Sequence, residues 1–235
     1  KKLAELLPEV DCFVGINDYT DICGIIGRGD RVRVDGEYAP TEKRVLSTPP
    51  HYAYLKIADG CDNRCTYCTI PSIRGRYRSR TPDSLMKEAE YLESMGVKEL
   101  ILVAQDVTRY GKDLGGEYLL VPFLKRLLSE RAFAKIRLLY CYPELVTDEL
   151  IDLIASENGM AKYIDVPLQH ISDPVLKRMG RRTDSAQIKT LFGKLRAAGI
   201  AIRTTFMVGF PGETEEQFAE LMDFVSEYRP DHTGA

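Results

Sequence analysis

From residue 52 onward the sequence alternates between short apolar runs and longer segments with helical periodicity. This alternation constrains the fold most, because repeated strand–helix units build a parallel sheet with right-handed crossovers. The predicted strands cover residues 53–58, 99–104, 136–140, 163–168 and 200–208, and a sixth begins at His232. The predicted helices cover residues 81–96, 121–130 and 184–198, and two more open at Thr147 and Thr214. Periodicity alone leaves two architectures open, a doubly wound sheet and a partial barrel.

Residues 1–50 do not share this pattern. A short strand is predicted within 10–15 and a short helix within 19–26, and residues 27–50 are rich in Gly, Arg, Asp and Pro. We interpret 27–50 as a linker and place a domain boundary near residue 50, because the first segment is too short to bury a core alone. The chain opens with two lysines rather than Met and an apolar leader. We therefore expect no secretory signal and a fragment of a longer protein.

Composition excludes several classes of protein. The chain has 235 residues, 44% of them hydrophobic, and a formal net charge of −3. That apolar content excludes a disordered chain, and the near-neutral charge excludes general affinity for polyanions. No apolar run approaches the roughly 18 residues of a membrane span. Of six cysteines, three lie within eight residues, which favours a metal or cofactor site in a reducing compartment over disulfides. We expect a cytoplasmic protein without membrane contact.

The strongest chemical signal is a C-x3-C-x2-C run formed by Cys61, Cys65 and Cys68, directly after the first predicted strand. Thiolates bind soft metals and iron–sulfur clusters, but a structural zinc site and a ferredoxin cluster both need a fourth ligand. Three thiolates therefore favour a 4Fe-4S cluster with one iron open to substrate or cofactor. Two alternatives remain: a zinc site completed by His51 or Asp62, and three incidental thiols.

Other candidate residues follow the carboxyl ends of predicted strands, where barrels build their sites. Each also has a structural interpretation, as a turn, a buried histidine or a small core residue. They are Gln105, Asp106, Cys141, Gln169, His170, Gly209 and Gly212.

Charge is unevenly distributed along the chain. Residues 61–80 hold five arginines (Arg64, Arg74, Arg76, Arg78 and Arg80) against Asp62, a local +4, whereas residues 211–235 hold seven acids against one arginine. The arginines are interpreted either as a surface for an anionic partner such as ribosomal RNA or as a solvated, ion-paired loop.

The cysteine spacing, with Tyr67 before the last cysteine and a strand before the first, resembles the radical S-adenosylmethionine (SAM) superfamily. The resemblance implies a partial (βα)6 TIM-like barrel and a 4Fe-4S cluster whose open iron chelates SAM. It further implies SAM cleavage to a 5′-deoxyadenosyl radical. Tyr67, Gln105, Asp106, Gln169, Gly209 and Gly212 are the expected cofactor-binding positions, and no side chain is expected to act as an acid or base.

The segments 57–61, 70–76, 102–111, 166–170 and 208–214 are similar to those of the methylthiotransferase family. Ala104-Gln105-Asp106-Val107-Thr108-Arg109-Tyr110-Gly111 resembles the branch that methylthiolates the β-carbon of an aspartate in small-subunit ribosomal protein twelve. The resemblance covers residues 50–235, and the first 48 or so are similar to the tail of the family's N-terminal domain. It implies an external electron donor and a second SAM that supplies the methyl group.

The chain departs from the full family pattern in two ways. The family's second 4Fe-4S cluster uses three cysteines of the N-terminal domain, and Cys12 and Cys23 do not lie in matching contexts. The C-terminal substrate-recognition domain is not in the sequence shown. We therefore expect one cluster here and a second in the full-length protein. Two alternatives stay open: a tRNA methylthiotransferase acting on a modified adenosine, and a non-catalytic iron–sulfur or zinc-binding module.

Overall fold

The structure is a computed structural model that describes residues 2–34, 36 and 44–235. It divides into two compact units, Lys1–Arg44 and Val45–Ala235. The predicted linker includes residues 35 and 37–43, which lie outside the described residues.

The described residues of the first unit form two short helices and a two-stranded parallel ladder. Strand β1 (Phe13–Val14) pairs with β2 (Val32–Arg33), and the helices are α1 (Lys2–Leu6) and α2 (Ile22–Arg28), the latter preceded by a 3-10 turn, η1 (Tyr19–Asp21). The linker prediction is therefore wrong at Val32–Arg33. Gly29, with φ of 70°, ends α2 and turns the chain back toward β1. Val32–Arg33, within the predicted linker, therefore pairs with β1.

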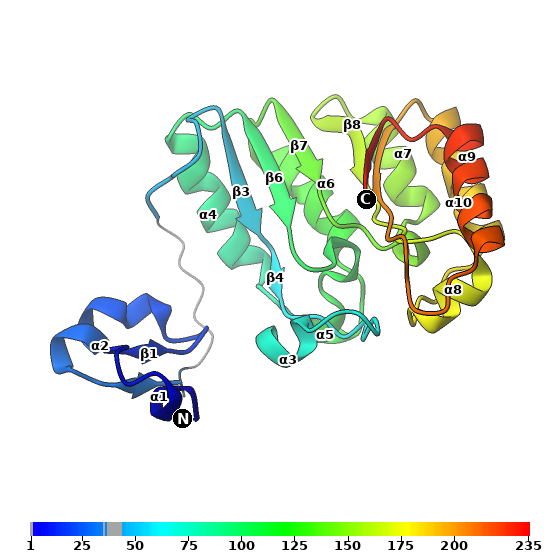
Figure 1. Cartoon of the computed structure of the whole chain (residues 1–235). Helices are drawn as coiled ribbons and strands as arrows, with labels where there is room; N and C mark the ends of the chain where they lie inside the picture. The colour runs from blue at the N-terminus through cyan, green and yellow to red at the C-terminus, as the bar shows by residue number, and fades with distance from the viewer. Residues whose placement is uncertain (1, 35, 37–43) are drawn as a thin grey trace. The chain divides into compact units, whose positions relative to one another are not determined.

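The second unit is built on one open sheet of six strands in the order β10-β9-β8-β7-β6-β3, with every neighbouring pair parallel. Figure 1 shows β3 and α4 at one end of this sheet and α9 and α10 at the other. The predicted alternation and the predicted partial barrel are confirmed. The strands are β3 (Tyr52–Lys56), β6 (Glu99–Val103), β7 (Lys135–Leu138), β8 (Met160–Asp165), β9 (Ala201–Thr205) and β10 (His232–Gly234).

The five longest helices connect these strands, and each helix predicted within residues 51–235 is present. They are α4 (Pro82–Ser94), α6 (Leu120–Glu130), α7 (Asp148–Ser156), α9 (Ser185–Ala197) and α10 (Glu215–Tyr228). Four of them begin at a side-chain cap: Thr81, Thr147, Asp184 and Thr214 each accept a bond from a first-turn N–H. Apolar side chains on the inner faces of these helices pack with the strands into one core, in which Leu55, Leu102 and Leu138 are fully buried.

The sequence did not predict the short elements that follow the strands. Strand β4 (Ala58–Asp59) pairs antiparallel with β5 (Arg78–Ser79), and between them lies α3 (Ile70–Arg74). The other short elements are η2 (Val107–Arg109), α5 (Lys112–Gly115), η3 (Pro143–Leu145) and α8 (Asp173–Arg178). The strands predicted to reach residues 168 and 208 end at Asp165 and Thr205, because the chain leaves the sheet there to form loops.

Among the described residues, no helix has the length and apolar character needed to cross a membrane.

Candidate functional site

The three clustered cysteines lie on the loop that follows β4. Gly60, with φ of 78°, begins this loop, and a Cβ at that position would lie 2.1 Å from the carbonyl oxygen of Arg76. The N–H of Cys61 donates to the carbonyl of Gly75 at 3.2 Å. Only glycine permits this close approach and backbone angle, so Gly60 fixes where the cysteine loop starts.

The far end of the loop is bonded to the last residue of α8 and to the residue that follows it. The N–H of Thr66 donates to the carbonyl of Met179 at 3.0 Å, and its hydroxyl donates to the carbonyl of Arg178 at 2.9 Å. The loop after the first strand of the main sheet is therefore bonded to the loop after the fourth.

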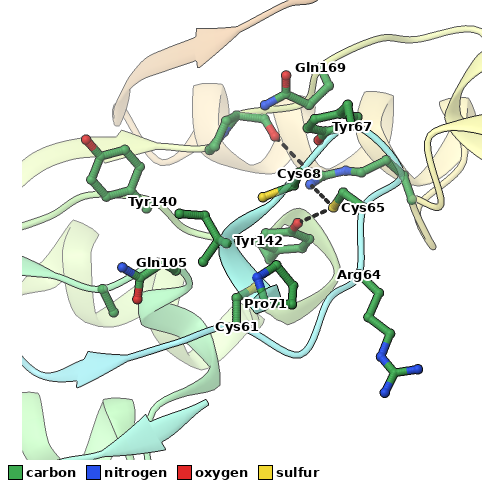
Figure 2. A pocket seen from close by; sticks show the side chains of 14 residues that line it. Cys61, Arg64, Cys65, Tyr67, Cys68, Pro71, Gln105, Tyr140, Tyr142 and Gln169 are labelled. Atoms are coloured by element: carbon green, nitrogen blue, oxygen red, sulfur yellow. Dashed lines mark hydrogen bonds between the residues drawn. The ribbon is translucent and has the colours of Figure 1, made fainter. Parts of the chain in front are cut away.

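A cavity of about 400 Å³ opens beside this loop, and all three cysteines line it. Gln105, Tyr140 and Gln169 line the cavity from other strand ends. Figure 2 shows Gln105 and Tyr140 across the cavity from Tyr67, and shows the side chain of Arg64 pointing away from the cysteines. The cavity thus sits at the carboxyl ends of the parallel strands, where barrel sites are built.

The sulfur atoms have different environments. Cys61 and Cys65 are buried, with 8% and 7% exposed, and Cys68 is half-buried. Burial raises the pKa of the Cys61 thiol, and the N–H of Asn63, which donates to its Sγ, opposes that rise. Sγ of Cys65 lies 2.8 Å from the hydroxyl oxygen of Tyr142 and 4.0 Å from a guanidinium nitrogen of Arg181.

The donor set fits an iron–sulfur cluster, while the side chains are not arranged as a preformed metal site. Three soft thiols on one short loop face one cavity, and thiolate is the ligand such clusters use. Within residues 2–34, 36 and 44–235, no three His, Cys, Asp or Glu side chains converge on one point.

The zinc alternative is not supported by the placement of its proposed fourth ligands. His51 precedes β3, at the opposite end of that strand from the cysteine loop. Asp62 faces other partners: its carboxylate accepts from the N–H of Tyr77 at 3.3 Å and lies 3.6 Å from Arg76.

Two amide side chains reach the cavity as the sequence predicted. The Oε1 atom of Gln105 is buried and has no hydrogen-bond partner among the described residues, so it is free to accept from a ligand. Gln169 adopts a left-handed backbone with φ of 74°. Two bonds hold that backbone: its N–H donates to Thr205 at 2.8 Å, and its carbonyl accepts from Met207 at 2.7 Å. Non-glycine residues in this conformation cluster at functional sites.

Four other candidates, of which Asp106, Gly209 and Gly212 were expected cofactor positions, are not among the residues that line this cavity. Asp106 is fully buried behind the loop, and His170 is fully buried against Glu213. Gly209 lies in a separate surface depression with Val208 and Phe218, and Gly212 lies against Arg178. Cys141 is fully buried and belongs to the core, as its structural interpretation predicted.

Among the residues that line the cavity, the sequence analysis missed two tyrosines and an arginine. Tyr140 and Tyr142 follow β7, so their position at a strand end was a usable signal. Arg181 follows α8, and its guanidinium stacks on the Tyr142 ring at 4.1 Å from the centroid. No local pattern marks Arg181, because only the tertiary fold brings it to the cysteine loop.

The arginines of residues 61–80 do not form one exposed patch. Arg80 is buried and paired with Glu88, and Arg76 is 90% exposed beside Asp62. Arg74 lies 3.8 Å from Asp59. The interpretation of these arginines as a solvated, ion-paired loop therefore fits residues 61–80 better than a single positive surface.

Comparison with known proteins identifies the class to which this fold and cysteine loop belong. Residues 55–225 match the Radical SAM superfamily, and the chain belongs to that superfamily. The fold of the radical SAM methyltransferase TsrM from Kitasatospora setae is similar, with a TM-score of 0.66 and 20% identity over 82% of this chain and 39% of that one. The cobalamin-dependent radical enzyme OxsB aligns with a TM-score of 0.59 and 19% identity over 73% of this chain and 26% of that one.

Curated relatives are closer in sequence. The ribosomal protein uS12 methylthiotransferase RimO of Geotalea uraniireducens is 50% identical over 100% of this chain and 54% of its own length. The protein of the same name from Clostridium tetani is 48% identical over 100% of this chain and 55% of its own length. The chain thus spans about half the length of these relatives.

Proposed function

We propose that this chain is the radical SAM domain of a methylthiotransferase that acts on ribosomal protein uS12. The identity of 50% to RimO of Geotalea uraniireducens over the whole chain is the observation that carries the proposal. The reaction is methylthiolation of the β-carbon of an aspartate. The alternative of a non-catalytic carrier is disfavoured by the three-thiol loop beside an open cavity, since a carrier closes its fourth ligand position.

Cys61, Cys65 and Cys68 would hold a 4Fe-4S cluster, and SAM would occupy the cavity beside it. When bound, these cofactors supply one-electron cleavage of SAM and a 5′-deoxyadenosyl radical. A radical is needed because an unactivated C–H bond is too weak an acid for any side-chain base. The protein contributes binding, orientation and exclusion of water.

Gln105, Gln169 and Tyr67 are the side chains we assign to the bound SAM. The unpartnered Oε1 of Gln105 accepts from an ammonium or ribose hydroxyl, and the fixed backbone of Gln169 presents its amide to the cavity. The ring of Tyr67 packs edge-on against Phe210, with centroids 6.4 Å apart, and forms an apolar wall. Burial raises the pKa of Tyr67, so its hydroxyl stays protonated.

The remaining assignments concern the whole protein. We assign residues 1–50 to the end of the N-terminal domain that carries a second cluster, and residues 51–235 to the radical domain. We further propose that the protein works in the cytoplasm, takes electrons from an external donor and meets ribosomal RNA beside its ribosomal protein substrate. The name of the relatives, and not the arginines of residues 61–80, motivates the RNA contact.

Iron retention and SAM cleavage test the cofactor assignment. After anaerobic reconstitution, Cys61→Ala, Cys65→Ala and Cys68→Ala should each lose the iron and the visible absorption of the cluster. Cys12→Ala should retain both. The reduced chain should release 5′-deoxyadenosine from SAM, and an iron-replete chain that releases none would overturn the radical assignment.

Mass spectrometry of uS12 after incubation with the full-length protein tests the substrate. A gain of one methylthio group on an aspartate supports the proposal. A product on tRNA instead would move the protein to the tRNA-modifying branch.

A further inference from the structure

A buried carboxylate lies directly behind the cysteine loop. Asp106 is fully buried, and both of its oxygens accept hydrogen bonds. Oδ2 accepts from the amide nitrogen of Asn63 at 2.9 Å. Oδ1 accepts from the hydroxyl of Thr108 at 2.5 Å and from the N–H of Arg109 at 3.2 Å. All three neighbours donate, so each carboxylate oxygen has at least one hydrogen-bond partner within the protein.

A series of hydrogen bonds links Asp106 to Cys65 through Thr108 and Tyr142. The hydroxyl of Thr108 accepts from the N–H of Tyr142 at 3.1 Å, so its own proton is directed at Asp106. The side chain of the same tyrosine reaches back to Sγ of Cys65 at 2.8 Å. The bonded groups come from the loops after β6 and β7, so they are fixed by the sheet.

Both ends of this series of hydrogen bonds contact the cysteine loop. Asn63 lies between Cys61 and Cys65 in the sequence, and its backbone N–H donates to Sγ of Cys61 at 3.5 Å. The network therefore contacts the loop at Asn63 and again at Cys65. Capping of the turn η2 accounts for the two bonds at Oδ1 of Asp106, but it does not account for the bond from Asn63 at Oδ2.

We infer that Asp106 is a positioning residue that holds the Cys61–Cys65 part of the loop in place for the cluster. This inference rests on the proposed function, because it assumes that the loop binds a cluster. Partners that orient metal ligands change metal affinity by roughly 10–100-fold when they are removed. Asp106 acts here through Asn63 and Tyr142 and touches no cofactor.

The test measures how fast the reconstituted chain loses iron to a chelator. Asn63→Ala removes the bond to Oδ2 and leaves the cap of η2 intact. We expect iron loss roughly tenfold faster or more, together with a lowered thermal midpoint, because the variant leaves Oδ2 of a buried carboxylate without its donor. The matched control is Asn158→Ala, at an exposed asparagine in the loop before β8, which should lose iron at the wild-type rate.

A reciprocal exchange distinguishes positioning from a general structural effect. Asn63→Asp places two carboxylates together and should lose iron faster than Asn63→Ala. Adding Asp106→Asn should restore retention, since the new amide nitrogen donates to the new carboxylate while its oxygen keeps Thr108 and Arg109. Wild-type rates in Asn63→Ala and Asn63→Asp, or no rescue in the double variant, would overturn the inference. If the wild-type chain binds no cluster, the proposed function fails instead.

Discussion

The hydroxyl oxygen of Tyr142 lies 2.8 Å from Sγ of Cys65, and the guanidinium of Arg181 stacks on the same ring. Burial raises the pKa of Tyr142, so the hydroxyl remains a donor to a thiolate. A hydrogen bond to a ligand sulfur favours the reduced, more negative cluster. Tyr142→Phe should therefore lower the midpoint potential of the bound cluster by tens of millivolts, on the order of a few-fold in the reduction equilibrium.

Tyr140→Phe is the control for that measurement. Its ring lines the same cavity, but its hydroxyl is not the group beside Cys65. An electron paramagnetic resonance titration of both variants should show a shift for Tyr142→Phe alone. Equal potentials in the two variants would mean that the bond to Cys65 does not persist once the cluster is bound.

A buried ion pair makes a prediction about stability. The side chains of Arg80 and Glu88 are 3% and 4% exposed and face each other, and Arg80 also donates to the hydroxyl of Ser84 at 2.9 Å. Glu88→Leu leaves the guanidinium without its counter-charge and should lower the free energy of unfolding by roughly 3–5 kcal/mol. Urea denaturation measures this. Lys125→Ala, which breaks an exposed pair with Glu149, should cost less than about 1 kcal/mol.

Cysteine alkylation should depend on pH and on position. Burial raises the pKa of the Cys141 thiol well above its usual value, and the charges of Asp106 and Asp165 add to that rise. At pH 8 this thiol stays neutral, and the thiolate is the reactive form. Iodoacetamide should therefore modify the exposed Cys23 and spare Cys141 in the folded chain. Peptide mass spectrometry reads both sites, and modification of Cys141 should appear only with denaturant.

His170 should contribute to stability rather than to cluster binding. Its Nδ1 accepts from the N–H of Ser172 at 3.0 Å, so Nε2 carries the proton and faces Glu213 at 3.2 Å. Glu213 also accepts from the N–H of Phe210 at 2.9 Å. His170→Ala removes the partner of a buried carboxylate and should lower the free energy of unfolding by about 1–3 kcal/mol. The iron content after reconstitution should equal that of the wild type; a proportional loss would place His170 in the site.

Periodicity predicted the regular elements because each buries one apolar face. Leu100 and Leu102 of β6, and Leu124 and Leu127 of α6, are fully buried where the pattern requires it. The short pairing of Ala58–Asp59 with Arg78–Ser79 has no such pattern. It depends on a close backbone approach at Gly60 that only the folded loop creates.

The sequence predicted that the three cysteines share one loop, but it predicted only part of what surrounds that loop. Strand-end position correctly brought Gln105 and Gln169 to the cavity. The same rule failed for Asp106, because successive residues at a strand end point in different directions. Arg181 reaches Cys65 across 116 positions of sequence, a contact that no local signal encodes.

The bond between Thr66 and the carbonyl of Met179 has a consequence for biosynthesis. The three thiols leave the ribosome long before Met179, so the nascent chain carries them unshielded while three further strands of the main sheet are made. If iron were loaded before residue 181 emerges, the cysteine loop would not yet be bonded to Met179. Cofactor delivery is therefore expected to be post-translational, and oxygen exposure during synthesis should damage this chain more than exposure after folding.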